Sequence, residues 1–328
     1  TLSSMVLKNF IQGGKFDFEL LFNEVRKVVR SLNKVVDVNN YSTEKGRKGG
    51  LAQRAIAIGT QGLADVFYLM DYIFTSNEAK KLNKDIFETI YFAAITESNR
   101  LCMDGIYEPY AHFEGSPMSQ GVFQFDMWGL KEDELSKRWP WGILKENVSK
   151  YGVCNSLFTA QMPVASSAKI TGSFEMTEPA HSAIFNRRVI GGEIMIVNKY
   201  LISDFEKIGI WSEDLKNEII MNEGSVQHLP FLTDDEKSIF KTAFELDQGW
   251  VIEHASDRQP FICQGQSVNL FFPAGSNKSY VNSIHLRAWK AGLKGLYYLR
   301  TSAGVQADKV GLKVERDALK DAEECISC

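Results

Sequence analysis

The sequence lacks several features that would assign it directly to a class of protein. No run of about 18 apolar residues occurs, which argues against a membrane-spanning helix. The N-terminus has no charged stretch followed by an apolar one, so a signal peptide is not expected. No long run of Lys or Arg is present and the formal net charge is −4, which argues against a polyanion as partner. We therefore expect a cytoplasmic protein that contacts neither a membrane nor a nucleic acid polymer.

Cysteine and histidine are also scarce. The five histidines stand singly along the chain, and because zinc needs four ligands we expect no metal site. Three of the five cysteines, Cys102, Cys154 and Cys263, lie among apolar residues, as reduced core thiols do. The sequence has no Ser-His-Asp order, HExxH motif, Walker loop or GxGxxG after a strand. It therefore carries none of the common hydrolase, metalloprotease and nucleotide-binding signatures.

What is present is ordinary globular material, with 328 residues of which 44% are hydrophobic and 24% charged. This is enough to bury a sizeable core. Residues 17–34 repeat apolar side chains at helical spacing, which predicts a helix. A second helix is expected to begin at the capping box Thr75-Ser76-Asn77-Glu78. Between the two, residues 54–70 predict a short strand, a break at 59–62 and a helix.

Further strands are expected at 154–163, 267–272 and 295–301, and further helices around 193–208, 234–257 and 282–294. Strands separated by helices predict an α/β fold with a largely parallel sheet. A total of roughly four or five strands is small for this chain length, and the first residues read like the interior of a domain. We therefore expect part of a larger unit. The polar stretch after Ser302 is typical of a tail.

Small residues follow the strand expected at 154–163, in the stretch MPVASSAKI at 162–170. Small side chains let the backbone approach a ligand, and Ser166 and Ser167 add hydroxyl groups. Free N–H groups at a helix start also attract phosphate. The pattern by itself fits an ordinary Ser-containing turn after a strand equally well.

Tyr297 and Tyr298 are adjacent in the last expected strand. Neighbours on a strand point to opposite faces. Ordinary packing would therefore place one ring in the core and leave the other hydroxyl hydrated. Because both phenols can be oxidised, a redox role is the alternative.

The chain ends in Cys325-Ile326-Ser327-Cys328, a CxxC spacing that suits a metal knuckle or a redox pair. No second CxxC or pair of histidines completes a metal site, so we interpret the motif as an exchangeable dithiol. As a flexible coil, the tether from Thr301 to Cys325 would span about 25–30 Å. That length is enough to carry the dithiol across the face of a domain.

Several long blocks of the sequence resemble the large, catalytic subunit of class I ribonucleotide reductase. They include RAIAIGTQGLADVF at 54–67, FEGSPMSQGVFQFDMWG at 113–129, YGVCNSLFTAQMPVASSAKITG at 151–172 and WKAGLKGLYYLRT at 289–301. The likeness covers residues 1–302 and extends to the C-terminal half of that subunit only. It implies a ten-stranded α/β barrel built from two parallel five-stranded halves. Residues 1–302 would form the second half, and residues 303–328 a flexible redox tail.

The resemblance also implies roles for single residues. The family's loop that binds the substrate's diphosphate, chiefly through backbone N–H groups, matches Pro163, Val164, Ala165, Ser166 and Ser167, with Val164 standing where the family has Thr. Tyr297 and Tyr298 match paired tyrosines that relay an oxidising equivalent from the small subunit. Cys325 and Cys328 match a tail dithiol that re-reduces the active-site disulfide.

The implied activity is reduction of ribonucleoside diphosphates to deoxyribonucleotides by radical chemistry. The implied partners are a radical-generating small subunit, thioredoxin or glutaredoxin, and the diphosphate substrate. The helix expected at 282–294 is a candidate for part of the groove that receives the small subunit's tail.

Two parts of the family pattern are missing, the Asn-Leu-Cys finger-loop motif and the reducible cysteine pair. We therefore expect a divided large subunit, in which an N-terminal fragment supplies these cysteines and the nucleotide-effector sites. No cofactor is expected on this chain, because the metal-radical centre would belong to the small subunit. We expect no turnover by this chain alone.

Two other functions fit parts of the sequence. A stand-alone thiol–disulfide oxidoreductase would use the terminal CxxC, and would lose exchange activity in Cys325→Ser while tolerating Tyr298→Phe. A non-catalytic binding module would keep the fold but restore no activity when mixed with an N-terminal fragment and a small subunit.

Overall fold

The computed structural model describes residues 1–175, 177–189 and 192–302. Its backbone is organised around extended segments that run parallel in the order in which they occur in the chain. β1 (Leu2–Val6) pairs in parallel with β4 (Ala57–Gln61). β7 (Leu270–Phe272) pairs in parallel with β8 (Leu299–Thr301).

Residues 157–161 join these two pairs into one ladder. A parallel bridge links Ile58 of β4 to Thr159, and a second links Gln161 to Gln266 just before β7. Five extended segments therefore run side by side in chain order. This arrangement confirms the α/β fold with a parallel sheet that the sequence predicts, and the described residues form an open sheet rather than a closed barrel.

The side chain of Gln161 holds the middle of the ladder together. Its Oε1 accepts from the Thr60 backbone N–H at 3.0 Å, and its Nε2 donates to the Thr60 carbonyl at 2.9 Å. Its backbone N–H donates to Gly265 O at 3.0 Å on the other side. The neighbouring Gly59 has no space for a side chain, because a Cβ there would lie 2.4 Å from the Ala160 carbonyl oxygen. Close backbone contact at Gly59 thus lets Gln161 reach β4.

β1 and β8 are the two ends of this ladder. In the part of the chain that the structure describes, each is hydrogen-bonded to another strand on one side only. Leu2 in β1 is 65% exposed and Leu299 in β8 is 48% exposed. Open edges that carry exposed apolar side chains are what half of a barrel would present to its other half.

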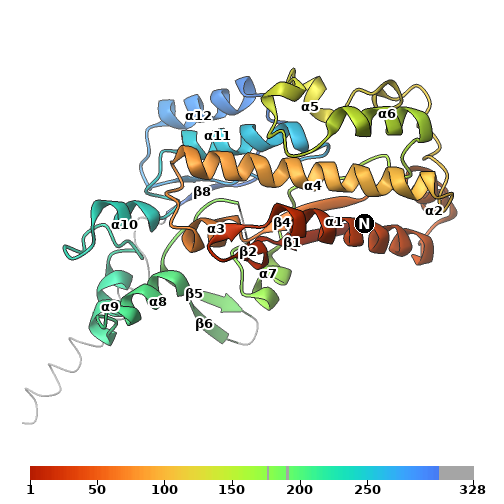
Figure 1. Cartoon of the computed structure of the whole chain (residues 1–328). Coiled ribbons are helices and arrows are strands. Elements are labelled where there is room, and N and C mark those ends of the chain that lie inside the picture. The colour runs from red at the N-terminus through yellow and green to blue at the C-terminus, as the bar shows by residue number, and fades with distance from the viewer. Residues whose placement is uncertain (176, 190–191, 303–328) are drawn as a thin grey trace, which may run out of the picture.

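Figure 1 shows α4 running along the main body, with α1 on one side and α11 and α12 on the other. Asp17 caps α1, its carboxylate accepting from Leu20 N at 2.8 Å, and the apolar period of the sequence forms the buried face of this helix. The helices are α1 (Phe18–Val38), α2 (Glu44–Gln53), α3 (Leu63–Leu69), α4 (Asn77–Met103), α5 (Gln124–Met127), α6 (Trp141–Tyr151), α7 (Ala165–Thr171), α8 (Lys199–Lys207), α9 (Glu213–Met221), α10 (Asp234–Ile239), α11 (Gln248–Arg258) and α12 (Lys278–Lys290). None of the helices in the described ranges is long and apolar enough to cross a bilayer.

A smaller lobe extends from the main body (Figure 1). It contains the antiparallel hairpin of β5 (Ile184–Val189) and β6 (Gly192–Val197) together with α8, α9 and α10. Its own apolar core gathers around Leu201, Phe205 and Ile219. A second short hairpin, β2 (Ile11–Gln12) with β3 (Lys15–Phe16), follows β1 in the main body.

The structure corrects three local predictions. The helix expected around 193–208 is wrong in its first part, because β6 runs to Val197 and the Asn198 side chain then caps α8 by accepting from Tyr200 N. The helix expected at 234–257 is two helices, α10 and α11, separated by residues 240–247. The N-cap of α4 is Ser76, one residue after Thr75, with which the predicted capping box begins, and the Ser76 hydroxyl accepts from Ala79 N.

His254 makes the stability of this fold depend on pH. The side chain is buried in α11, its Nε2–H donates to Phe74 O at 2.7 Å, and burial lowers the pKa of His254 to about 3. Below a pH of about 6.5 the unfolded chain binds a proton at this histidine that the folded chain does not bind. Stability is therefore lost as the pH falls from about 6.5 toward the folded pKa, by up to about 1.4 kcal/mol per pH unit.

We predict that wild type loses about 2 kcal/mol more unfolding free energy than His254→Gln between pH 7 and pH 5. Urea denaturation at both pH values measures this difference. His112→Gln, at an exposed position, is the matched control and should lose as much as wild type. An equal loss in wild type and His254→Gln would contradict the prediction.

Candidate functional site

The loop from Pro163 to Ser167, which we call the serine loop, leaves the sheet shortly after Gln161 and enters α7. Pro163, Ala165 and Ser166 are exposed, whereas Val164 is buried. The Ser167 hydroxyl donates to the Val164 carbonyl at 3.2 Å. The first N–H groups of a helix have no partner within the helix, so this loop presents free N–H groups beside small side chains. The buried side chain of Val164 belongs to the core and not to this surface.

Two lysines hold the other end of α7. Lys8 Nζ donates to Thr171 O at 2.6 Å and to Gly172 O at 2.8 Å, and Lys199 Nζ donates to Gly172 O at 2.7 Å. Burial, together with the neighbouring Lys199, lowers the pKa of Lys8. Positive charge at the C-terminal carbonyls of a helix is favourable because of the helix dipole. The two ammonium groups therefore fix α7 at the end opposite the serine loop.

Asp65 fixes the chain that follows α7. Its carboxylate accepts from Phe174 N at 2.7 Å and from the Tyr200 hydroxyl at 2.6 Å, and Lys199 Nζ lies 3.7 Å away. Burial and the hydrogen bond to Asp65 raise the pKa of Tyr200. Sequence reasoning missed Asp65, Lys8 and Lys199. The one available signal was an aspartate in the first turn of the helix that follows a buried strand.

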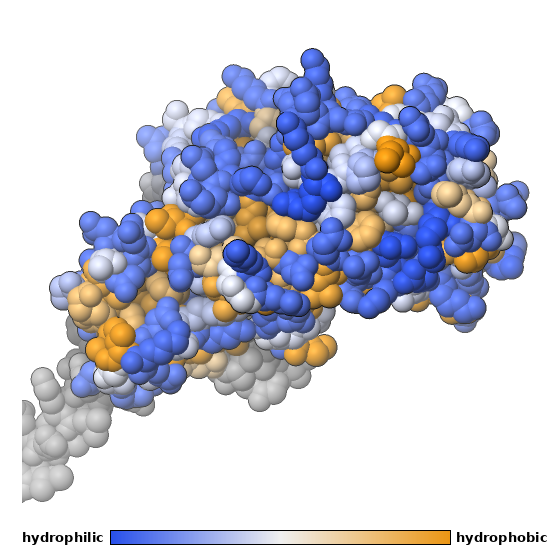
Figure 2. All heavy atoms as spheres, in the orientation of Figure 1, coloured by the Kyte–Doolittle hydropathy of each residue, from blue (hydrophilic) through white to orange (hydrophobic). Residues whose placement is uncertain are grey.

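A cavity of about 410 Å³ opens beside α7, and none of the loop residues 163–167 is part of its lining. It lies between Ala168 and Lys169 of α7, residues 172–175 and 178–181, the hairpin strand β6, Phe271 of β7 and Arg300 of β8. Its lining is mainly apolar, with Asp65 and Arg300 among the charged groups. Figure 2, in the orientation of Figure 1, shows apolar surface gathered between hydrophilic side chains in the middle of the face turned toward the viewer. No group of three or more His, Cys, Asp or Glu side chains that could hold a metal occurs in the described ranges.

Tyr297 and Tyr298 touch each other instead of pointing to opposite faces. The Tyr297 hydroxyl donates to the Tyr298 hydroxyl at 3.2 Å, and the ring centroids are 4.0 Å apart. The rings are 45% and 51% exposed. Hydrogen bonding to Tyr298 raises the pKa of Tyr297. The expectation from strand geometry is wrong because β8 begins only at Leu299, so the two tyrosines precede the regular strand.

The serine loop and the tyrosines lie on neighbouring parts of the same sheet. Tyr297 N–H donates to Val268 O at 2.8 Å, which is two residues beyond Gln266, the partner of Gln161. The tyrosines are thus level with the point where the chain leaves the sheet for the loop. Two strand spacings, or about 10 Å across the sheet, separate the tyrosines from that point. Cys325 and Cys328 lie outside the described residues.

The comparisons with known proteins agree with this architecture. The family model described as "Ribonucleotide reductase, barrel domain" matches residues 1–299. The chain is 44% identical over 312 residues to the ribonucleoside-diphosphate reductase large chain of Schizosaccharomyces pombe, covering 94% of this chain and 37% of that protein. It is 40% identical over 328 residues to the large subunit of Danio rerio, covering 99% of this chain and 40% of that protein.

A solved structure, the class Id ribonucleotide reductase alpha subunit of Actinobacillus ureae, matches with a TM-score of 0.68 and 25% identity. The match covers 92% of this chain and 49% of the solved one. The chain spans about two fifths of the length of the two curated large subunits named above. All of these matches fall in one family. The chain belongs to the family of ribonucleotide reductase large subunits, and its residues 1–299 match the model of that family's barrel domain.

Proposed function

We propose that this chain is one component of a ribonucleoside-diphosphate reductase, which reduces ribonucleoside diphosphates to deoxyribonucleotides by radical chemistry. Family membership supports the reaction class. The observation that carries the proposal for this chain is the contact between the Tyr297 and Tyr298 hydroxyls, about two strand spacings from the serine loop. Oxidisable side chains and the proposed diphosphate loop thus share one sheet.

In this proposal the residues from Pro163 to Ser167 bind the substrate's diphosphate. The exposed loop backbone and the start of α7 supply N–H donors, and the small side chains of Ala165 and Ser166 let the phosphate oxygens approach. Lys8 and Lys199 act from the other end of α7, because they hold the helix in place through its last carbonyls. They are positioning residues that lie away from the loop itself.

Tyr297 and Tyr298 would carry the oxidising equivalent. A phenol that loses an electron must also lose its hydroxyl proton. The 3.2 Å contact between the two hydroxyls gives that proton a place to go when the neighbouring tyrosine is the oxidant. Both rings are about half exposed, so a partner chain can reach them. Leu286 and Trp289 on α12 are 48% and 73% exposed and offer apolar surface for such a partner, the radical-generating small subunit.

The terminal cysteines Cys325 and Cys328 would return reducing power to the active site and be reduced in turn by thioredoxin or glutaredoxin. Nucleotide effectors and the metal-radical centre would bind to partner chains. The open edges at β1 and β8 would be paired by the N-terminal part of the large subunit, which completes the barrel.

Reconstitution tests this proposal. The purified chain alone should form no deoxyribonucleotide, whereas the chain mixed with an N-terminal fragment, a small subunit and a chemical dithiol should do so. Tyr298→Phe should reduce the activity of the mixture to background, because a phenylalanine ring cannot be oxidised reversibly in this way. Tyr151→Phe, at another partly exposed tyrosine, is the matched control and should remain active. Turnover by the chain alone, or full activity of Tyr298→Phe, would refute the proposal.

Lys8 and Lys199, which we call the lysine clamp because both bind the last carbonyls of α7, give a second prediction. Lys8→Met keeps most of the side chain's length but removes the donor to Thr171 O and Gly172 O. A charged hydrogen bond of this kind contributes about 1.5–3 kcal/mol, so α7 should be held less firmly. We expect KM for the diphosphate substrate to rise about tenfold, with a smaller change in kcat. Lys15→Met, at an exposed lysine, should leave both values unchanged, and an unaltered KM in Lys8→Met would show that the clamp does not act on the loop.

A further inference from the structure

Lys294 is an exposed residue whose ammonium group is nevertheless completely hydrogen-bonded to the protein. Its Nζ donates to the carbonyl oxygens of Ile262 at 2.9 Å, Cys263 at 2.8 Å and Gln264 at 3.0 Å. An ammonium group has three N–H donors and no acceptor, so these three consecutive carbonyls satisfy it. We call residues 262–264 the carbonyl loop. Three charged hydrogen bonds to one loop make Lys294 a fixed point of the fold.

The place of the carbonyl loop in the fold favours a positive charge there. α11 runs directly into the 3-10 turn Gln259–Phe261, and the carbonyl loop follows this turn. The C-terminal end of a helix carries partial negative charge. The ring of Trp128 lies 5.1 Å from Lys294 Nζ, and the face of an indole ring also attracts a cation. Both surroundings stabilise the ammonium group against the loop.

The carbonyl loop is bonded to the middle of the sheet. The Cys263 N–H donates to Thr159 Oγ1 at 3.1 Å, and the Gln264 N–H donates to Thr159 O at 3.1 Å. The Gln264 side chain reaches further, because its Nε2 donates to Ile56 O at 2.9 Å. In return, the N–H groups of Phe158 and Thr159 donate to Cys263 Sγ at 3.2 and 3.3 Å. The carbonyl loop is therefore held to the segment 157–161, which leads into the serine loop.

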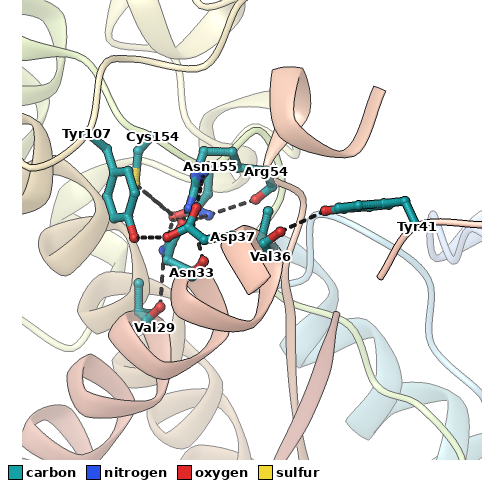
Figure 3. A network of polar contacts seen from close by, with 9 residues as sticks. All are labelled: Val29, Asn33, Val36, Asp37, Tyr41, Arg54, Tyr107, Cys154 and Asn155. Carbon is teal, nitrogen blue, oxygen red and sulfur yellow. Dashed lines mark hydrogen bonds and ion pairs between the residues drawn. The ribbon is translucent and has the colours of Figure 1, made fainter. Parts of the chain in front are cut away.

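The chain just before that segment is fixed as well. Asn155 Nδ2 donates to Arg54 O at 2.7 Å and to Asn33 Oδ1 at 3.0 Å. Arg54 Nε donates to the same Asn33 oxygen at 3.0 Å, and Arg54 Nη1 lies 2.8 Å from the Asp37 carboxylate. Figure 3 shows these four side chains converging at α1. The segment that binds the carbonyl loop is thus anchored to a helix outside the sheet.

Lys294 connects this anchored frame to the tyrosines, because it precedes Tyr297 by only three residues. Among the described residues, no backbone group from Lys294 to Leu296 takes part in a hydrogen bond. Backbone bonding resumes with the Tyr297 N–H, which donates to Val268 O at 2.8 Å. The ammonium group of Lys294 and the partly buried side chain of Leu296 are therefore what hold the chain just before the tyrosines.

We propose that Lys294 is a positioning residue for Tyr297 and Tyr298. By binding the carbonyl loop, its ammonium group fixes where the chain enters Tyr297, and with it the place of both phenols relative to the serine loop. A displacement of about 1 Å can cost a reaction step on the order of a hundredfold in rate, so the placement sets the rate of the relay. The effect on the relay rests on the proposed reductase function, whereas the placement itself concerns this chain alone.

Hydrogen exchange of the purified full chain tests the placement. Lys294→Met keeps most of the side chain's length but removes its three donors. We expect the amides of Tyr297 and of Leu270, which donates to Tyr298 O at 2.9 Å, to exchange at least tenfold faster than in wild type. Lys290→Met, at another exposed lysine in the last turn of α12, is the matched control and should exchange like wild type. No gain at Tyr297, or an equal gain in the amides of β4, would overturn the proposal.

Kinetics of the reconstituted mixture test the effect on the relay. Lys294→Met should lower kcat at least tenfold and leave KM for the diphosphate substrate unchanged, which is the reverse of the effect expected for Lys8→Met. Lys294→Arg keeps a charged donor and should recover part of the lost kcat. An unaltered kcat in Lys294→Met would overturn the role in the relay. A wild-type mixture without turnover would refute the proposed function instead, and the exchange measurement would still decide whether Lys294 places the tyrosines.

Discussion

The amide of Gln161 is the interaction on which the rest of the structure depends. It bonds Thr60 of β4 through both side-chain atoms, and its backbone bonds Gly265 ahead of β7. Backbone hydrogen bonds already join the middle segment to both neighbours, among them Ala160 N to Ile58 O at 3.2 Å and Ser267 N to Gln161 O at 2.8 Å. The Gln161 side chain adds its own bonds to Thr60 at the point where the chain leaves the sheet. The β1–β4 pair and the β7–β8 pair become one sheet through the segment 157–161, which ends at this residue.

That single sheet brings the proposed functional groups together. The serine loop starts two residues after Gln161. The tyrosines pair with the segment that follows Gln266, the bridge partner of Gln161, because Tyr297 N donates to Val268 O. Lys8 comes from the turn after β1, Asp65 from the helix after β4, and both hold the chain around α7. Lys8, Asp65 and the serine loop each follow a different strand of the sheet, and the tyrosines directly precede β8. A sheet that remains open at β1 and β8 therefore already assembles one wall of the proposed site.

The sequence predicted what depends on local physics and missed what depends on distant contacts. The helical period of α1 and the α/β class were confirmed, because apolar spacing is a property of short segments. Residues 193–197 were wrongly predicted as helix, since a short apolar run does not distinguish a hairpin strand from a helix. The lysine clamp on α7 arises between segments far apart in the sequence. The contact between the adjacent Tyr297 and Tyr298 was missed because β8 begins only at Leu299. The diphosphate and relay roles rest on the family resemblance and remain predictions.

The central claim is that the open edges at β1 and β8 are paired by the N-terminal part of a large subunit. Hydrogen exchange of the backbone amides measures this directly, in Leu2–Val6 and Leu299–Thr301, with and without that N-terminal fragment. The account predicts that exchange at both edges slows at least tenfold when the fragment binds, while amides of the central β4 strand change little. Binding of the fragment that leaves both edges exchanging as fast as before would contradict it.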